Sequence, residues 1–368
     1  MQGGESLMKR VCLVAGGTGG HIFPAIAFGK WITKHQEEVK VSFVCGSRPL
    51  EQEIYEASHI TPYYLPTSGS PLGIRSLSGK MRRLKEFGLS FISFKKLLRN
   101  CHVDACVLFG GYVSFIPLMV CHLTGVPVFV HEQNSVAGKV TRLSSRLGKK
   151  VASGWEVCTP LSPDAFHWTG VPVRGFSLRE PKEAWELMAL GKKLPEKKII
   201  GVLGGSLMSQ RLIQLMGPML RAQEMRNFFF LFLGDSQLAD IAREFHGSPE
   251  NISVIGKQWD MSNFYSVVDA VVTRGGASTL SELATLGIPA VVVPWQEAAD
   301  NHQERNALCF IEHNNGAIWH ENDSPKAFQE CILKILRNTQ RPPRSISKGD
   351  ESESLWRLIS SSIGREIL

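Results

Sequence analysis

The strongest constraint on the fold is a pattern that occurs four times along the chain. A short apolar run is followed by a glycine-rich turn and then by a stretch with helical spacing; the turns lie at residues 16–20, 110–111, 204–206 and 275–279. Apolar, β-branched runs without alternation are typical of strands buried on both faces of a parallel sheet. The pattern therefore predicts doubly wound α/β domains.

Two such domains are expected, because 368 residues exceed the usual size of one domain. Glycine and proline interrupt residues 168–175, which we interpret as the connection between the domains. We predict an N-terminal domain at residues 8–173 and a C-terminal domain at residues 174–345, facing a cleft. Strands are predicted at residues 11–15, 41–45, 103–109, 126–130, 198–203, 228–233, 252–255, 271–273 and 290–294, and helices at 22–34, 207–223, 258–268, 306–314 and 354–363.

The composition argues against several classes of protein. The eight cysteines show no C-x-x-C spacing and several lie in apolar runs, which favours buried reduced thiols over disulfides or a zinc site. No apolar run approaches the roughly 18 residues of a membrane span, and no signal-peptide core precedes Lys9. The loop Gly16–His21 lacks the third glycine of the dinucleotide fingerprint, and the strand at 41–45 ends without an acidic residue, so an NAD-binding role is disfavoured.

The excess positive charge belongs to the first half of the chain. Residues 1–173 hold 19 Lys and Arg against 11 Asp and Glu, whereas residues 174–368 hold 22 against 23. This excess predicts an anionic partner: nucleic acid, anionic lipid or a phosphorylated substrate. Over residues 74–99, basic residues are interleaved with apolar ones at helical spacing. Such a segment fits either a helix that docks on an anionic membrane or an ordinary helix with its apolar stripe in the core.

Two residues near the glycine turns could carry chemistry. His21 follows the first turn, where a neutral imidazole could take a proton from an attacking hydroxyl; alternatively, it caps or packs the helix start. Glu282 follows the turn at 275–279, whose helix N-terminus suits a diphosphate, and could accept hydrogen bonds from two vicinal sugar hydroxyls. The spacing Thr279-x-x-Glu282 also fits a capping box, in which the glutamate bonds the backbone at the helix start.

Other polar residues have the same double interpretation. Arg174 and Arg274 could bind phosphate or bridge elements of the fold. Asn134 follows a predicted strand and could contact a ligand or form an Asx turn. His302 and Gln303 lie in a predicted polar loop, where they could meet a ligand or simply be solvated.

Taken in order, these motifs resemble those of the MurG family of peptidoglycan N-acetylglucosaminyltransferases. The resemblance covers roughly residues 9–320 and rests on Gly16–Ala25, Gly110–Ser114, His131–Asn134, Gly170–Arg174, Gly204–Ser206, Asp260–Met261, Arg274–Glu282 and the group His302, Gln303, Asn306 and Ala307. Each motif is modest alone, but the ordered set is specific.

The resemblance implies a GT-B fold, with two Rossmann-like domains and a C-terminal helix, about residues 350–368, that returns to the first domain. It implies an inverting transfer of N-acetylglucosamine from UDP-N-acetylglucosamine (UDP-GlcNAc) to the muramyl 4-hydroxyl of lipid I, which gives lipid II. Neither a cofactor nor a metal ion is expected, and nucleic acid is not an expected partner. The implied setting is the cytoplasmic face of the inner membrane, on an anionic surface, with cell-wall and division proteins as further possible partners.

The resemblance also implies roles for individual residues, beginning with His21 as catalytic base. The expected UDP-GlcNAc contacts are Thr18, Gly19, Gly20, Asn134, Arg174, Ser206, Gln258, Ala277, Ser278, Thr279, Glu282 and Gln303. The acceptor diphosphate is expected at Gly17, Thr18, Gly110, Gly111 and Tyr112. The membrane patch is expected at Leu72, Ile74, Leu77, Lys80 and Phe87.

The sequence departs from the family's pattern in three places. Met208 replaces a glycine near the phosphate, Gln258 stands where an apolar residue is usual, and Phe115-Ile116 replaces Gly-Pro. The alternatives that stay open are a GT-B transferase with another acceptor, an epimerase of that fold, and a nucleotide-sugar-binding scaffold without turnover.

Overall fold

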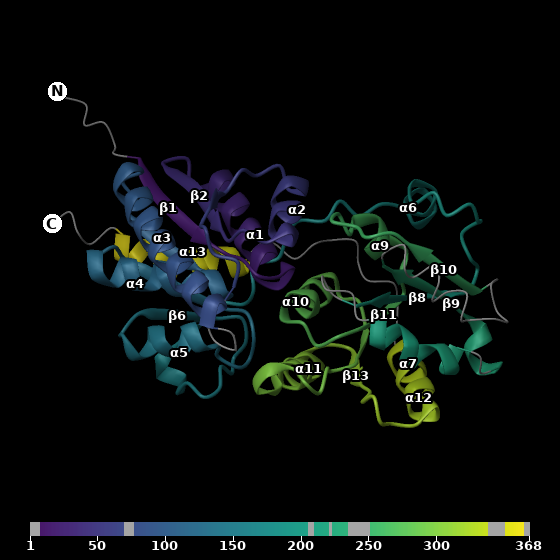
Figure 1. The fold of residues 1–368 in the computed structure, drawn as a ribbon. Helices are drawn as coiled ribbons and strands as arrows, with labels where there is room; N and C mark the ends of the chain where they lie inside the picture. Colours follow the sequence, from purple (N-terminus) through teal and green to yellow (C-terminus); the bar gives the residue numbers. More distant parts are fainter. Residues whose placement is uncertain are drawn as a thin grey trace. The chain divides into compact units, whose positions relative to one another are not determined.

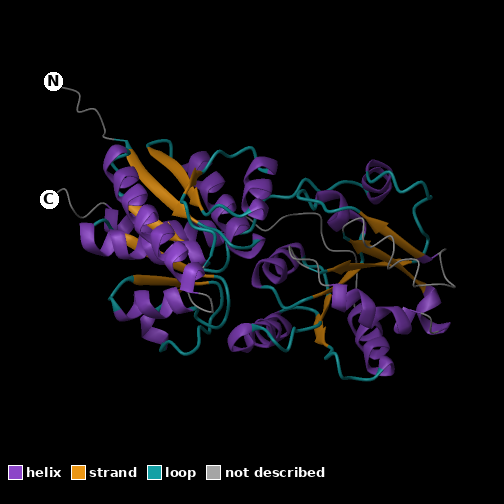
Figure 2. Cartoon of the chain, in the orientation of Figure 1, coloured by secondary structure: helices purple, strands orange, loops and turns teal. Residues whose placement is uncertain are grey.

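The computed structural model describes residues 8–69, 77–204, 210–220, 223–234, 251–337 and 350–363. The chain divides into two compact units, which we call unit 1 (residues 1–174 and 349–368) and unit 2 (residues 175–348). Each unit holds a parallel β-sheet with helices packed against it (Figures 1 and 2). The predicted doubly wound α/β architecture is confirmed in both units.

Unit 1 contains a seven-stranded sheet in the order β3-β2-β1-β4-β5-β6-β7, and every neighbouring pair in its described part is parallel. Its strands are β1 (Lys9–Val14), β2 (Val39–Cys45), β3 (Tyr63–Tyr64), β4 (Ala105–Leu108), β5 (Val128–Glu132), β6 (Lys150–Ser153) and β7 (His167–Trp168). Its helices are α1 (Gly19–His35), α2 (Pro49–Ala57), α3 (Leu77–Asn100), α4 (Phe115–Thr124), α5 (Lys139–Arg146) and α13 (Asp350–Ile363).

Both faces of the central strands of unit 1 are buried. Cys12 and Val14 of β1 pack with Phe94 of α3 in one apolar cluster, while Val11 and Leu13, which point to the other face, are also fully buried. This explains why β1 lacks the alternation of an exposed strand: helices cover it on both sides.

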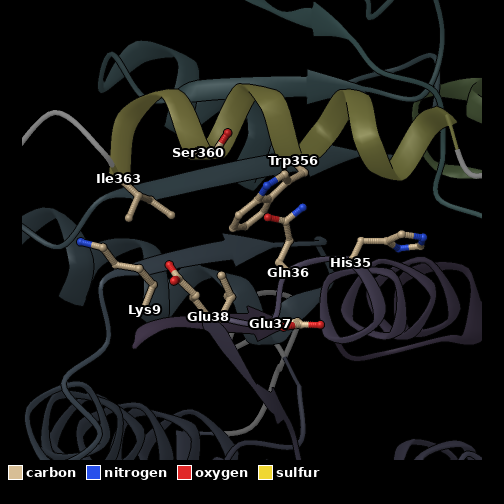
Figure 3. Close-up of a pocket in the computed structure, with 9 residues that line it drawn as sticks. Lys9, His35, Gln36, Glu37, Glu38, Trp356, Ser360 and Ile363 are labelled. Atoms are coloured by element: carbon tan, nitrogen blue, oxygen red, sulfur yellow. The ribbon is translucent and has the colours of Figure 1, made fainter. Parts of the chain in front are cut away.

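Helix α13 comes from the end of the chain but belongs to unit 1. Leu355 and Ile359 of α13 are fully buried, and Lys150 of β6 donates a hydrogen bond to the Ser362 hydroxyl at 2.8 Å. A cavity of about 360 Å³ lies at the starts of β1 and β2. Figure 3 shows α13 above the residues that line it. The cavity is lined by Lys9, His35, Gln36, Glu37, Glu38, Val39, Trp356, Ser360 and Ile363. It therefore lies at the amino ends of these strands, not at the carboxyl ends where α/β sheets bind ligands.

Unit 2 contains a parallel sheet in the order β10-β9-β8-β11-β12-β13 among its described residues. Its strands are β8 (Lys198–Leu203), β9 (Phe228–Leu233), β10 (Ile252–Ile255), β11 (Ala270–Thr273), β12 (Ala290–Val292) and β13 (Gly316–Ile318). Its helices are α6 (Pro181–Leu187), α7 (Gln210–Leu220), α9 (Ser262–Val267), α10 (Ala277–Leu286), α11 (His302–His313) and α12 (Pro325–Leu336).

Local signals in the sequence set several helix boundaries. The Ser324 hydroxyl accepts a hydrogen bond from Ala327 N at the start of α12, and Pro325 occupies the first turn. Helices α4 and α10 end at Gly125 and Gly287, whose φ angles of 76° and 64° are left-handed. Glycine adopts this conformation without steric cost, so both helices stop there.

The strand order places the glycine turns where ligands bind. In unit 1 the order reverses between β1 and β4, and in unit 2 it reverses between β8 and β11. The four glycine turns follow these four strands. Open α/β sheets bind ligands in the crevice at such a reversal, beyond the carboxyl ends of the strands. Each unit therefore has one candidate half-site.

Candidate functional site

The half-site of unit 1 is built from the loops that follow β1, β4 and β5. The second glycine turn packs directly on the first: a Cβ atom added to Gly111 would lie 2.2 Å from the Gly16 carbonyl oxygen. A Cβ added to Gly110 would lie 3.1 Å from the His21 ring. Gly110 and Gly111 have φ angles of 89° and 77°, so the turn needs glycine for both conformation and space.

A buried carboxylate, that of Glu51, holds the backbone of the first glycine loop. Gly17 N donates a hydrogen bond of 2.6 Å to Glu51 Oε1, and the Glu51 side chain is fully buried. Burial, with the nearby Glu51 charge, raises the pKa of the Tyr112 hydroxyl well above its usual range. The Tyr112 hydroxyl donates to the Thr67 carbonyl at 3.2 Å, and the Arg48 guanidinium lies over the ring. Glu51 was not predicted as a site residue, because it is one of three glutamates in α2 and its burial is visible only in the fold.

His21 lies in the first turn of α1 and is half-buried. The N-cap of α1 is Thr18, in an extended conformation and with no side-chain cap hydrogen bond. His21 Nδ1 lies 2.8 Å from Gln133 Oε1, in the loop after β5. The histidine is therefore not a capping residue; it is held by a side chain from a neighbouring strand end. Gln133 belongs to the motif His131–Asn134 but was not a predicted site residue, because its contact with His21 depends on the fold.

Glu132 organises the loop that carries Asn134. Glu132 Oε1 accepts hydrogen bonds from Asn134 N at 3.2 Å and Asn134 Nδ2 at 3.1 Å, while its Oε2 accepts from Gly138 N at 2.8 Å and from the Thr141 hydroxyl at 2.6 Å. The carboxylate is buried. The Asn134 side chain is thus oriented by Glu132 and is half-buried at the carboxyl end of β5.

Arg174 is the last residue of unit 1 before the chain enters unit 2. Its guanidinium carbon lies 4.1 Å from the centre of the Phe23 ring in α1. The face of an aromatic ring attracts a cation and so helps to orient it. Arg174 is thereby placed near the start of α1.

In unit 2 the turn after β11 is held by internal contacts. Arg274 is buried and its Nη1 lies 2.7 Å from Glu321 Oε1 and donates to the Val293 carbonyl at 3.1 Å. These contacts favour the bridging interpretation of Arg274. A Cβ on Gly275 would lie 2.3 Å from the Gln303 carbonyl oxygen, so this turn also requires glycine.

Helix α10 presents its N-terminus after the glycine turn. Its N-cap is Gly276, so Ala277, Ser278 and Thr279 form its first turn. The capping-box interpretation of Glu282 is wrong, because Thr279 is inside the helix and the glycine N-cap has no side chain. Glu282 is instead buried and its Oε2 accepts a hydrogen bond from the Tyr265 hydroxyl of α9 at 2.7 Å.

The prediction that His302 and Gln303 lie in a loop is wrong. Helix α11 begins at His302, because Asp300 and Asn301 have left-handed φ angles of 54° and 51° that form the turn before it. Gln303 Oε1 accepts a hydrogen bond from Trp295 N at 3.0 Å, which fixes its amide group.

The remaining predicted site residues are dispersed or lie outside the described residues. Gln258 is exposed in the segment between β10 and α9. Ser206 and Met208 lie outside the described residues, as do Leu72 and Ile74 and the side chain of Leu77.

The predicted membrane segment divides into two faces in helix α3. Phe87 is half-buried and packs on Phe115 of α4, with ring centres 6.0 Å apart, beside the core of unit 1. By contrast, Met81, Leu84 and Ile92 are 66%, 74% and 66% exposed. Their spacing places them on one side of α3, and exposed basic residues share that helix. These basic residues are Lys80, Arg82, Lys85, Lys95, Lys96 and Arg99.

The described residues contain no group of three or more His, Cys, Asp or Glu side chains arranged to hold a metal ion. Within the same ranges, no helix is long and apolar enough to cross a membrane.

Two Rossmann-like units, each with a glycine-turn half-site, are the architecture of the GT-B fold class. The model of the glycosyltransferase family 28 N-terminal domain matches residues 11–153, and that of the C-terminal domain matches residues 199–356. The UDP-N-acetylglucosamine--N-acetylmuramyl-(pentapeptide) pyrophosphoryl-undecaprenol N-acetylglucosamine transferase of Acinetobacter baumannii (strain AYE) is 31% identical over 346 residues, 91% of each chain. The transferase of the same name from Parabacteroides distasonis is 29% identical over 337 residues, 90% of each chain. The chain therefore belongs to glycosyltransferase family 28 and, within it, to the MurG family.

Solved structures show the same fold. The crystal structure of Acinetobacter baumannii MurG has a TM-score of 0.67 at 24% identity and covers 96% of this chain and 99% of its own. A UDP-GlcNAc 2-epimerase from Neisseria meningitidis, solved with UDP-GlcNAc bound, has a TM-score of 0.65 at 14% identity and covers 96% and 100%. At these identities the likeness concerns the fold alone.

Proposed function

We propose that this glycosyltransferase moves N-acetylglucosamine from UDP-GlcNAc to the muramyl 4-hydroxyl of lipid I, with inversion, and so makes lipid II. The reaction named for the Acinetobacter and Parabacteroides relatives supports this substrate pair. The observation that carries the proposal is the placement of His21: a half-buried imidazole at a helix N-terminus, between two glycine turns at the switch point of unit 1. A base and an anion-binding loop are the groups that a diphosphate-bearing acceptor requires.

In the proposed reaction His21 is the general base. The acceptor oxygen attacks the anomeric carbon, its proton passes to the imidazole, the new C–O bond forms, and the bond from the anomeric carbon to the phosphate oxygen breaks. UDP leaves with that electron pair. One displacement of this kind inverts the anomeric carbon. The helix N-terminus of α10, at Ala277, Ser278 and Thr279, would stabilise the charge that develops on the leaving diphosphate.

The donor's other contacts are assigned by their chemistry. Glu282, whose carboxylate is already oriented by Tyr265, would accept hydrogen bonds from the ribose hydroxyls. Asn134 and Gln303 would contact the sugar, as the family's motifs imply; a neighbouring hydrogen bond orients each amide. Residues still proposed as donor contacts on the basis of the family's motifs alone are Thr18, Gly19, Gly20, Arg174, Ser206 and Gln258.

The acceptor diphosphate is proposed to bind at the two glycine turns of unit 1. Gly17, Gly110 and Gly111 allow the backbone to approach the phosphate oxygens closely, and Thr18 and Tyr112 flank them. Lipid I is bound to a bilayer, so we also propose that α3 docks unit 1 on the anionic cytoplasmic face of the membrane. The exposed Met81, Leu84 and Ile92 would enter the interface while the basic residues of α3 meet lipid phosphates.

The test of the reaction is incubation with UDP-GlcNAc and a lipid I analogue in detergent or vesicles. We expect a disaccharide product, and we expect the His21→Ala variant to lose transfer while it still binds UDP. Absence of transfer by the wild-type protein would refute the proposal. Conversion of UDP-GlcNAc without acceptor would identify an epimerase, and donor binding without turnover would identify a scaffold.

The test of membrane docking is co-sedimentation with phosphatidylglycerol vesicles. We expect Met81→Glu with Ile92→Glu to weaken binding and to leave turnover of a water-soluble acceptor analogue unchanged, because both side chains are exposed. Leu333→Glu on α12, where Leu333 is 43% exposed, is the matched control in unit 2. Equal vesicle binding by all three proteins would refute docking through α3.

A further inference from the structure

A chain of hydrogen bonds leads from His21 into the interior of unit 1. His21 Nδ1 meets Gln133 Oε1 at 2.8 Å, Gln133 Nε2 meets His131 Nδ1 at 2.9 Å, and His131 Nε2 meets the Gly170 carbonyl oxygen at 2.8 Å. Gln133 and His131 are both buried, with exposed fractions of 2% and 0%. Buried groups of this kind are ordered, so the donor in each hydrogen bond can be identified in turn, beginning at the Gly170 carbonyl.

The far end determines the proton position on His131. The Gly170 carbonyl can only accept a hydrogen bond, so His131 Nε2 carries a proton. Burial lowers the pKa of His131 to about 4, so the ring is neutral at physiological pH and its Nδ1 carries none. The ring is further held by stacking on Phe109, with ring centres 5.3 Å apart. His131 therefore presents a bare nitrogen to Gln133.

This nitrogen and a backbone carbonyl orient the amide of Gln133. Gln133 Nε2 lies 2.9 Å from His131 Nδ1 and 2.8 Å from the His131 carbonyl oxygen. Both partners are acceptors, so the NH₂ group, which has two protons, must face them. The amide oxygen then points the other way, toward His21. The opposite orientation would place an oxygen against two acceptors in a buried site, which is costly.

We infer that Gln133, oriented by His131, holds neutral His21 as the Nδ1–H tautomer and leaves Nε2 bare to receive the acceptor's proton. An amide oxygen accepts only, so the nitrogen beside it must carry the proton. Gln133 and His131 are positioning residues in this scheme; neither touches the substrate. The inference rests on the proposed role of His21 as the base. An amide at this position can hold the tautomer of His21 without adding a charge beside the ring.

The wild-type protein provides the first test, by long-range ¹H–¹⁵N NMR correlations of the histidine rings, with His21→Ala used to assign the His21 signals. We expect one protonated and one bare nitrogen in His21, with the proton on Nδ1. A His21 ring with its proton on Nε2 would overturn the inference. This measurement needs no turnover, so it stands apart from failure of the lipid I assay.

The second test compares Gln133→Met with Gln133→Glu. Methionine has a similar volume but no acceptor for Nδ1–H, so we expect the tautomer preference to disappear and kcat to fall by roughly ten- to a hundredfold, part of the 10²–10⁴-fold that a general base contributes. The KM for UDP-GlcNAc should change less than about twofold. Glutamate keeps an acceptor oxygen for His21, and as a buried carboxylic acid its O–H can donate to the His131 acceptors in place of the NH₂ group, so it should retain the Nδ1–H signal. Loss of that signal in both variants, or in neither, would contradict the inference.

The third test uses His131→Phe, which keeps the stacking surface but removes Nδ1. The backbone carbonyl of residue 131 still orients the Gln133 amide, so we expect a smaller fall in kcat than in Gln133→Met. A fall in kcat as large as that of Gln133→Met, with a normal His21 tautomer, would show that His131 acts through packing and not through the hydrogen-bond chain.

Discussion

The loop that presents Asn134 should depend on the negative charge of Glu132. Glu132 accepts four hydrogen bonds, two at each carboxylate oxygen. In Glu132→Gln the shape is kept but one oxygen becomes an NH₂ group. If that group faces Thr141, the hydroxyl can turn and accept from it, but the N–H of Gly138 is left without an acceptor. The opposite orientation would leave both Asn134 donors unpaired.

The magnitude follows from these losses. Gly138 is exposed, so water can meet its N–H and the lost bond costs only about 0.5–1.5 kcal/mol. The remaining bonds lose their charge assistance, so we expect a destabilisation of about 1–3 kcal/mol. For a unit of this size, this corresponds to a fall of roughly 2–12 °C in the Tm. The KM for UDP-GlcNAc should change little, because in this orientation the amide oxygen still accepts both hydrogen bonds from Asn134; a rise in KM would indicate the opposite orientation.

The assay is thermal unfolding, with donor kinetics on the same samples. The control is Glu156→Gln, which removes an exposed carboxylate nearby and should leave both the Tm and the KM unchanged. A Glu132→Gln variant that melts with the wild-type protein would refute the reasoning, since it would show that the four bonds do not contribute to the stability of unit 1.

Three other perturbations give separable outcomes. Gly111→Ala should lower the Tm more than Gly125→Ala. Both residues have left-handed φ angles, but only at Gly111 would the new Cβ lie 2.2 Å from a backbone oxygen, so an equal fall in Tm of the two variants by calorimetry would exclude the clash. Tyr265→Phe removes the hydrogen bond to Glu282, and a bond to a charged group contributes about 1.5 kcal/mol, so we expect UDP to bind about tenfold more weakly in titration calorimetry. Unchanged affinity for UDP would argue against Glu282 as the ribose ligand. His131 has its pKa lowered to about 4 in the folded protein against 6.5 when unfolded, so the unfolded chain binds the extra proton. Its contribution to stability is complete above pH 6.5 and falls by about 3 kcal/mol as the pH drops to 4, and in denaturant titrations this slope should be reduced in His131→Phe.

The longer buried strands could be predicted because they are continuous apolar runs: β8 was expected at residues 198–203 and lies at Lys198–Leu203. The short strands β3, β6, β7 and β13 were not predicted, because two to four residues are too few to show a pattern. Helix starts were harder to predict. The first turn of α11 is entirely polar, so its helical spacing is invisible, and the left-handed Asp300 and Asn301 that precede it look like ordinary loop residues.

The faces of α3 could not be predicted from its own sequence. Its apolar residues form one broad stripe, and only the neighbouring helix decides which of them are covered: Phe87 meets Phe115 of α4, whereas Leu84 does not pack inward. The hydrogen bonds that lead from His21 to His131 could not be predicted either. They depend on the distance between His21, in the first turn of α1, and Gln133, in the loop after β5, which are 112 residues apart in the sequence. A motif identifies the residues of such a chain but not the direction of its protons.

The return of α13 to unit 1 has a consequence for biosynthesis. Unit 1 begins at the start of the chain, yet its helix with the buried Leu355 and Ile359 is translated after all of unit 2. During translation, part of the apolar surface of unit 1 therefore remains uncovered while the 174 residues of unit 2, residues 175–348, emerge from the ribosome. A nascent chain arrested near residue 348 should thus bind chaperones and be cleaved by proteases at unit 1, and release of the last helix should end both.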